Sequence, residues 1–365
     1  MRVMVLGGTR FIGAAIVEEL DAHGHELLLV HRGEHEPADL PAADHLHADR
    51  RDLPHLRGAI DEFEPEAMVD TCALSTADAE TALAAVGDDV RLLVLSSMDV
   101  YRAFGSVLAG AETDPLPLDE TAPVRSERYP YRGRIERGDD YEKLDVEAPY
   151  LARAATVCRL PMVYGERDYQ RREEPLLRRV RAGRARIPIG AGSWLWTRGY
   201  VRDVAAGVRL ALESDAAVAE VLNLGESRSW SMGLWARHVL EAAGSQAELV
   251  RVPDVLLPDD LEELGTVPQR LLFDSSSSVE VPAHDSGQIE LVRVPDVVLP
   301  KDLEQFGTVH QHLLVSSAKA RDLLGWEETD PHEAIHRSVA WHLAHPPEDA
   351  SDDFSEDDRA LEAAR

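Results

Sequence analysis

The stretch RVMVLGGTRFIGAAIVEEL, residues 2–20, joins an apolar run to a glycine-rich turn. The run predicts a strand over residues 2–6, and apolar residues at helical spacing predict a helix over residues 11–23. Gly7 and Gly8 allow a sharp bend and a close backbone approach, and Gly13 lets the helix pack closely on the strand. Free N–H groups at the start of such a helix attract phosphate. The turn therefore predicts a dinucleotide site, although Arg10 stands where a middle glycine often falls.

Strand-like and helical segments alternate beyond this turn. Further strands are expected at 25–30, 66–73, 90–97, 155–160 and 220–225, and helices at 56–63, 76–86, 138–148 and 200–214. Alternation of this kind predicts a doubly wound parallel α/β sheet of the Rossmann type. We assign residues 1–160, with about 198–225, to this dinucleotide-binding domain. A smaller C-terminal α+β substrate lobe is expected from 161–197 and 226–345, followed by an acidic, disordered tail at 346–365.

One segment of the predicted lobe occurs twice. Residues 248–275 and 290–317 match at most positions, with an offset of 290 − 248 = 42 residues. Two copies are too few for a repeat architecture. The pattern indicates a tandem duplication in which one copy fills the native place and the other forms an added surface hairpin. The sequence leaves open which copy is native.

Composition excludes several classes of function. The net charge is −29, and Lys143, Lys301 and Lys319 are the chain's only lysines. Such a surface repels phosphate backbones, so general nucleic-acid binding is not expected. No apolar run is long enough to span a bilayer, and no leader precedes the first strand, so a cytoplasmic protein is expected. Cys72 and Cys158 lie in apolar runs, which predicts buried free thiols.

No metal site is expected from the histidine motifs. HEAIH, from His332 to His336, matches a zinc signature but lies at the start of an amphipathic helix with no clear third ligand. The histidines of HLHADRRDLPHL, residues 45–56, are interpreted as surface residues.

The end of the second strand bears on which dinucleotide is bound. It reads Val30, His31, Arg32, Gly33, without the carboxylate that NAD sites usually place there. Arg32 suits a 2′-phosphate, which favours NADP over NAD. The alternative is that Arg32 is an ordinary solvated loop residue.

Several further motifs follow in one order along the chain. They are LSSMDVYR at 95–102, YEKLDVE at 141–147, RLPMVYGERD at 159–168, YVRDVA at 200–205 and LNLG at 222–225. Over about residues 1–345, apart from the duplicated segment, this order resembles the extended short-chain dehydrogenase/reductase superfamily and its NAD-dependent epimerase/dehydratase family. The form GGTRFIG is also similar to an atypical branch that includes chloroplast stem-loop RNA-binding proteins.

The resemblance implies roles for residues at matching positions. Pyrophosphate would bind to the turn formed by Gly7, Gly8, Thr9, Arg10, Phe11, Ile12 and Gly13. Asp49 and Arg50 would flank the adenine, and Thr71, Cys72 and Ala73 would line the nicotinamide ribose. Ser97 matches the catalytic serine or threonine, and Asp99 matches an acid of the dehydratases. Lys143 matches the cofactor-binding lysine, and Glu147 matches an acid that often follows it.

The catalytic tyrosine is where the chain departs from the family. The family places it four residues before the lysine, on the same helix face, where the ammonium lowers the phenol pKa. Asp139 occupies that position, and Tyr141 would lie on nearly the opposite face. Asp139 is thus an acid/base candidate, with Tyr129 and Tyr131 as upstream substitutes. Lys143 would hold the cofactor ribose, pair with Asp139, or do both.

These observations predict an NAD(P)-dependent enzyme of the epimerase/dehydratase type, acting on a sugar nucleotide or a related hydroxyl or keto compound. Two alternatives stay open: a cofactor-binding protein without redox turnover, with a regulatory or scaffold role, and a reductase of a non-sugar ketone. The resemblance also implies a homodimer packed through the helices near 76–86 and 138–148.

Overall fold

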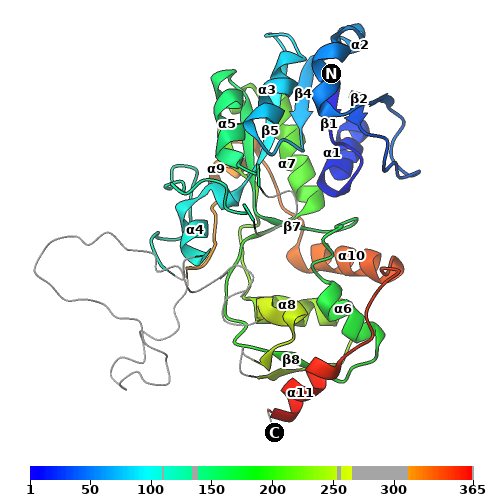
Figure 1. Ribbon diagram of the computed structural model, residues 1–365, viewed down its shortest axis with the longest axis vertical. Coiled ribbons are helices and arrows are strands. Elements are labelled where there is room, and N and C mark those ends of the chain that lie inside the picture. Colours follow the sequence, from blue (N-terminus) through cyan, green and yellow to red (C-terminus); the bar gives the residue numbers. More distant parts are fainter. Residues whose placement is uncertain (109–110, 134–138, 253–255, 265–310, 364–365) are drawn as a thin grey trace, which may run out of the picture.

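The computed structural model describes residues 1–108, 111–133, 139–252, 256–264 and 311–363. Its centre is a seven-stranded parallel sheet with the strand order β10-β6-β5-β4-β1-β2-β3 (Figure 1). The strands are β1 (Arg2–Leu6), β2 (Glu26–His31), β3 (Asp44–His47), β4 (Ala67–Asp70), β5 (Arg91–Ser97), β6 (Thr156–Leu160) and β10 (Val221–Asn223). The predicted doubly wound α/β sheet is confirmed, with β3 as an additional edge strand that the pattern did not indicate.

Helices cover both faces of the sheet, as the apolar strands require. One face carries α1 (Phe11–Ala22) and α7 (Val201–Glu213), which pack against each other and against the side chains of Val3, Val5 and Leu29. The other face carries α2 (Arg57–Phe63), α3 (Thr76–Ala84) and α5 (Lys143–Ala152), with the 3-10 turn η1 (Arg50–Leu56). Burial on both sides explains why the central strands are almost continuously apolar.

The carboxyl ends of the strands lead into the second lobe (Figure 1). Short turns come first, η2 (Met98–Val100) and α4 (Arg102–Leu108), and the strands β7 (Met162–Tyr164) and β9 (Arg198–Tyr200) pair with each other. The lobe contains α6 (Glu174–Arg181), α8 (Met232–Ala242), η5 (Asp259–Leu264), α10 (Pro331–Ala344) and the paired strands β8 (Arg186–Ile189) and β11 (Glu248–Arg251). The turn η3 (Asp215–Ala217) and helix α9 (Ala318–Leu324) lie beside β10.

The duplicated segment enters the described structure from both copies. The first copy supplies β11 and η5, whereas the second supplies residues 311–317. Leu313 bridges to Trp196 and Val315 to Leu118, and both side chains are buried. The remainder of the two copies and their linker lie outside the described residues. The described part of the lobe therefore contains the start of the first copy and the end of the second.

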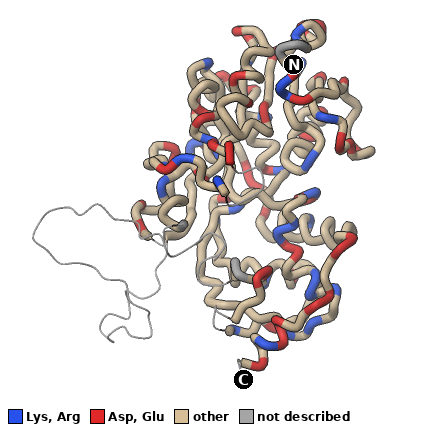
Figure 2. The backbone as a smooth tube through the Cα atoms, viewed as in Figure 1, with Lys and Arg blue, Asp and Glu red and all other residues tan. Residues whose placement is uncertain are grey.

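The described part of the acidic tail, residues 346–363, contains a helix, whereas the sequence predicted disorder. Helix α11 (Ser355–Ala363) buries Ala360 and Leu361 against the lobe. The Asp357 carboxylate is also buried and accepts two hydrogen bonds from the Arg179 guanidinium, at 2.7 and 2.8 Å. Arg179 binds Asp260 of η5 as well, at 2.7 and 2.9 Å. Composition alone missed this contact, because a buried arginine far away in sequence offsets the acidic charge. Figure 2 shows basic and acidic positions close together in the lobe near the C-terminus.

Candidate active site

The glycine-rich turn between β1 and α1 is tightly packed. Gly7 has φ +85°, and a Cβ atom on Gly13 would lie 2.3 Å from the Gly7 carbonyl oxygen. Arg10 precedes α1 but provides no side-chain cap, and the first turn of α1 holds no acidic residue. The N-terminal N–H groups of α1 thus carry no competing anion, which is the arrangement that binds a phosphate group.

A cleft of about 820 Å³ runs along the carboxyl ends of β1, β2, β4 and β5. It is lined by most residues that the sequence predicted for the site: Gly7, Thr9, Arg10, Phe11, Ile12, Gly13, Arg32, Asp49, Arg50, Thr71, Cys72, Ser97, Tyr141 and Lys143. Gly8, Ala73 and Asp99 are buried behind its wall. Asp139 is exposed and does not line the cleft.

Arg50, which the sequence placed beside the adenine, is held in the cleft by the buried Asp70 and the half-buried Asp78. Its guanidinium donates to the Asp70 carboxylate at 2.7 Å and lies 3.2 Å from Asp78. Asp70 also accepts a hydrogen bond from the Tyr150 hydroxyl, at 2.7 Å. This network fixes the position of Arg50 while neutralising its charge, so that the side chain offers a surface for stacking more than a free cation.

Arg32 and Glu34 face the cleft at the end of β2. Their exposed side chains form an ion pair of 2.8 Å. The sequence-based prediction of the bound dinucleotide rested on Arg32 alone. The structure shows that the Glu34 carboxylate also lies at this position. Cys72 is also exposed at the cleft, against the prediction of a buried thiol, whereas Cys158 is buried.

Helix α5 begins at Lys143 and not near residue 138, which changes the geometry of the catalytic candidates. Asp139 lies in a loop, where its carboxylate accepts a hydrogen bond from the Gly133 N–H at 2.8 Å. The alternative in which Lys143 pairs with Asp139 along one helix therefore does not fit the structure. Tyr141 also precedes the helix, so helical spacing does not set its direction. Its ring centroid lies 5.9 Å from the Lys143 Nζ.

Lys143 is buried between two strands of the sheet. Its ammonium donates to the carbonyl oxygens of Ala73, at 2.6 Å, and Leu95, at 3.1 Å. Burial lowers its pKa, and the carboxylates of Asp70 and Asp99 partly oppose this effect. The ammonium is thus fixed at the floor of the cleft.

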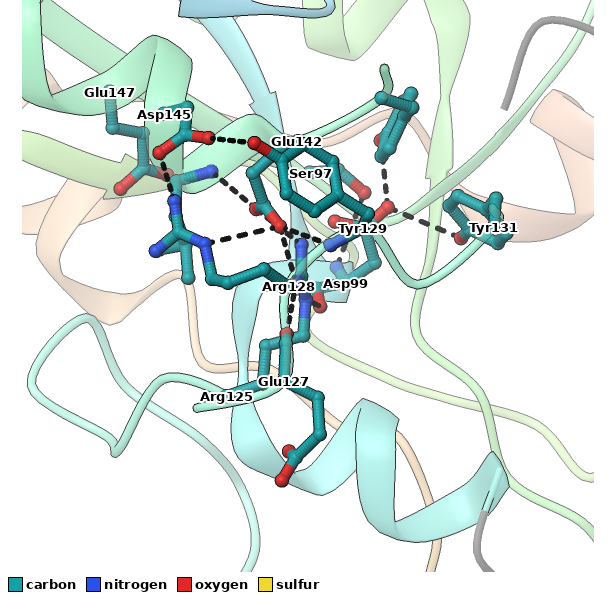
Figure 3. A network of polar contacts seen from close by, with 12 residues as sticks. Ser97, Asp99, Arg125, Glu127, Arg128, Tyr129, Tyr131, Glu142, Asp145 and Glu147 are labelled. Atoms are coloured by element: carbon teal, nitrogen blue, oxygen red, sulfur yellow. Dashed lines mark hydrogen bonds and ion pairs between the residues drawn. The ribbon is translucent and has the colours of Figure 1, made fainter. Parts of the chain in front are cut away.

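Two tyrosine hydroxyls converge on one buried carboxylate. The Asp99 Oδ2 accepts hydrogen bonds from Tyr141, at 2.7 Å, and Tyr131, at 3.2 Å. Figure 3 shows the Tyr131 hydroxyl directed toward Asp99. Burial raises the pKa of Asp99, and burial together with the Asp99 charge raises the pKa of Tyr141 well above 10. Both effects favour the protonated forms of these groups. Tyr129 points elsewhere, toward Asp145.

A buried ion pair sets the backbone that carries Tyr141 and Lys143. Glu142 accepts hydrogen bonds from the Arg125 guanidinium at 2.7 and 2.8 Å and from the Tyr129 N–H at 2.7 Å (Figure 3). The same carboxylate caps α5 by accepting from the Leu144 N–H at 3.0 Å. Arg125 in turn donates to the Asp99 carbonyl oxygen at 2.8 Å. These contacts join Asp99 to the start of α5.

Glu147 supports the sheet instead of facing the cleft. It accepts hydrogen bonds from the Ser96 hydroxyl, at 2.6 Å, and from Arg159, at 2.8 and 2.9 Å. The sequence did not indicate three further cleft residues, Tyr169, Gln170 and Arg172, which follow β7. Tyr169 lies under the Arg10 guanidinium, 4.8 Å from ring centroid to Cζ. Their only signal in the sequence is their position directly after the motif VYGERD.

Across residues 3–225, the sequence matches the NAD dependent epimerase/dehydratase family. This range includes the glycine turn, the cleft and all three candidate groups Asp99, Tyr141 and Lys143. The chain belongs to this family. Within the described residues, we find no helix with both the length and the apolar character needed to cross a membrane.

Individual relatives of this family member are distant. It is 24% identical over 257 residues to the chloroplast stem-loop binding protein of 41 kDa b from Arabidopsis thaliana, a match that covers 67% of this chain and 63% of that protein. It is 25% identical over 274 residues to 2'-dehydrokanamycin reductase from Streptomyces kanamyceticus, with 72% of each chain covered. A UDP-glucose-4-epimerase from Stenotrophomonas maltophila with bound NAD has the same fold, with a TM-score of 0.64, 18% identity, and 94% and 97% of the two chains covered.

Proposed function

We propose that this protein is an NAD(P)-dependent oxidoreductase that interconverts a hydroxyl and a keto group on a sugar nucleotide or a related compound. In this proposal Tyr141 takes the place of the displaced family tyrosine. The observation that carries it is the position of Tyr141, which lines the cleft with its ring centroid 5.9 Å from the Lys143 Nζ and its hydroxyl 2.7 Å from Asp99.

The cofactor proposal rests on the glycine turn and on the uncapped start of α1. A bound nicotinamide dinucleotide would supply or accept hydride. Its pyrophosphate would bind at Gly7 to Gly13, and Lys143 would hold its ribose. For NADP, Arg32 would leave Glu34 and bind the 2′-phosphate. An exposed ion pair costs less than about 1 kcal/mol to break, so this exchange is feasible. For NAD, Glu34 would accept the ribose hydroxyl.

The protonation states favour reduction of a ketone. Because burial and the Asp99 charge raise the pKa of Tyr141, its hydroxyl is protonated near neutral pH, so it would be the proton donor when a ketone is reduced. Tyr141 would donate this proton to the substrate oxygen while Ser97 donates a second hydrogen bond. The nearby ammonium of Lys143 would stabilise the phenolate that results. The reductase name of the Streptomyces relative supports this direction.

The first test is a titration of NADPH and NADH into the purified protein, followed by nicotinamide fluorescence. Turnover is then measured with UDP-glucose and dTDP-glucose plus the oxidised cofactor, and with simple hydroxy ketones plus the reduced cofactor. We expect Tyr141→Phe to reduce kcat by about 10²–10⁴-fold, the usual contribution of a positioned acid. Cofactor binding should persist in this variant.

Tyr129→Phe is the matched control, because Tyr129 contacts Asp145 and not Asp99. Equal losses in both variants would contradict the role of Tyr141. Tight cofactor binding without turnover of any of these compounds would instead favour the cofactor-binding protein that lacks redox chemistry. Failure to bind either nucleotide would overturn the enzyme proposal itself.

A further inference from the structure

Three histidines and a glutamate meet at the edge of the sheet, next to the cleft. They are His31 at the end of β2, His45 and His47 of β3, and Glu36 from the loop between these strands. Each offers one nitrogen or oxygen, and these atoms all lie within 4.8 Å of one another. The sequence indicated surface histidines here, because it gave no sign of β3.

Strand geometry brings the histidines together. Residues two apart on a strand share one face, so His45 and His47 point the same way and Leu46 points to the core. In the parallel pairing of β2 with β3, His31 lies opposite His47. Neighbouring strands are about 4.8 Å apart, which lets the three rings meet. The ring centroids of His31 lie 5.1 Å from His45 and 4.9 Å from His47.

The Glu36 carboxylate lies close to all three histidines. Its Oε1 contacts the His47 Nε2 and lies 3.4 Å from the His31 Nε2 and 3.8 Å from the His45 Nδ1. In a tetrahedral zinc site with bonds of about 2.0–2.1 Å, neighbouring ligand atoms are about 3.3 Å apart. The Glu36 Oε1 thus lies within 3.8 Å of a nitrogen from each of the three histidines, so small side-chain movements would bring the ligand atoms to the spacing that a small divalent ion imposes.

The four residues differ in how freely they can bind a metal. The Gly33 N–H donates to the His31 Nδ1 at 3.1 Å, so the proton of the neutral ring stays on Nε2. That proton now faces the His45 Nδ1 at 2.8 Å. The His45 Nδ1 thus accepts from His31, and the His47 Nε2 donates to the Glu36 carboxylate. On metal binding, His31 would turn its proton to Glu36 and the His47 proton would move to Nδ1, which frees one lone pair on each β3 histidine. Hydrogen bonds to ligating carboxylates are common around metal sites.

We propose that Glu36, His45 and His47 bind a divalent transition-metal ion of the zinc class, and that His31 positions the Glu36 carboxylate. Two imidazoles and one carboxylate are a common ligand set for such ions, with a further position open to water. The ion would fasten the loop between β2 and β3 to the edge strand. Because this loop also carries Arg32 and Glu34, metal binding would order the cofactor end of the cleft.

The proposal is tested on the full chain after removal of metal with EDTA. Zn²⁺ is titrated by calorimetry, and Co²⁺ by the visible absorption that reports coordination geometry. We expect one equivalent to bind. His47→Ala and Glu36→Gln should each weaken binding by about 100-fold or more, and His31→Asn by about 10- to 100-fold, as for outer-shell partners. Circular dichroism checks that each variant is folded, which we expect because His45, His47 and Glu36 are exposed.

His35→Ala is the matched control, because His35 belongs to the same loop but not to the cluster. A second control, His332→Ala with His336→Ala, removes the HEAIH pair. Both controls should bind Zn²⁺ as the parent does. Absence of one-equivalent binding, or equal losses in the controls, would overturn the proposal. So would binding of inorganic phosphate, and not Zn²⁺, that is lost in His47→Ala, since the cluster would then be an anion site.

Discussion

Tyr141 shows how a single side chain can be misplaced by a spacing rule. The rule assumes one continuous helix through residues 139–143, but Glu142 caps α5 and the helix begins only at Lys143. Outside the helix, the backbone at Tyr141 is free to direct the ring beside Lys143. The sequence contains both Tyr141 and Lys143, but the way they face each other depends on Glu142 between them. Glu142 forms a buried ion pair with Arg125, which the spacing of residues does not reveal.

Glu226 is a second side chain whose behaviour follows from burial. Desolvation raises its pKa to about 7, against an ordinary value of 4.5, while Tyr164 and Arg198 oppose the shift. The folded state therefore holds this proton more tightly than the unfolded chain. The resulting stabilisation is complete below the ordinary pKa and is lost as the pH rises to about 7, by about 3 kcal/mol at most.

We expect Glu226→Gln to remove this loss, so that the variant gains stability relative to the parent between about pH 5 and about pH 8. Urea unfolding at both pH values measures the difference. The exposed Glu62→Gln is the control and should show no such gain. A pH-independent difference between Glu226→Gln and the parent would contradict the assignment.

The contact between β1 and α1 makes a prediction about how these segments pack. A Cβ on Gly13 would meet only backbone atoms, the Gly7 oxygen at 2.3 Å and the Gly8 Cα at 3.2 Å, so no side chain can move aside. We expect Gly13→Ala to lower the free energy of unfolding by about 1–3 kcal/mol, as overpacking does, and to weaken NADPH binding because the turn must shift.

Gly58→Ala in α2 is the control, because its Cβ would meet no heavy atom within 4 Å. Its stability should stay equal or rise by up to about 1 kcal/mol from better helix propensity. Thermal unfolding and nicotinamide fluorescence compare the two variants. Normal NADPH binding by Gly13→Ala would show that the turn is not the pyrophosphate site.

Helices and strands could be predicted from the sequence where a local pattern of apolar residues determines them. The apolar runs at β1, β5 and β6 and the helical spacing of α1 and α7 appear in the structure with small shifts at their ends. The strand β3 was missed because the sequence DHLH is polar on both sides of one leucine, as suits an exposed edge. Helix α11 was missed because its stability depends on Arg179, whose partner could not be read from local composition.

For the chain as a whole, the duplicated segment gives the sharpest test. Removing residues 265–306 joins Leu264 to Gly307 in the register of the repeat and removes none of the described residues. We expect this deletion to keep NADPH binding and to change the unfolding temperature by no more than roughly 4 °C. Calorimetry and the cofactor titration check both outcomes.

The companion deletion of residues 276–317 keeps the other end of the repeat. It would place Phe273 where the buried Val315 now lies, and Arg270 where the His312 Nδ1 accepts the Leu195 N–H at 3.1 Å. Overpacking should then cost about 1–3 kcal/mol. If the protein lacking residues 276–317 were more stable than the protein lacking residues 265–306, residues 265–275 would pack in the lobe better than residues 307–317 do.

The composite origin of this segment also has a genetic consequence. Because the lobe takes its start from one copy and its end from the other, a crossover at any equivalent point between the two copies leaves a segment with the same beginning and the same ending. Each such event removes 306 − 264 = 42 residues without a frameshift or a new junction sequence. A single recombination between the two copies would therefore shorten this chain by the length of one repeat.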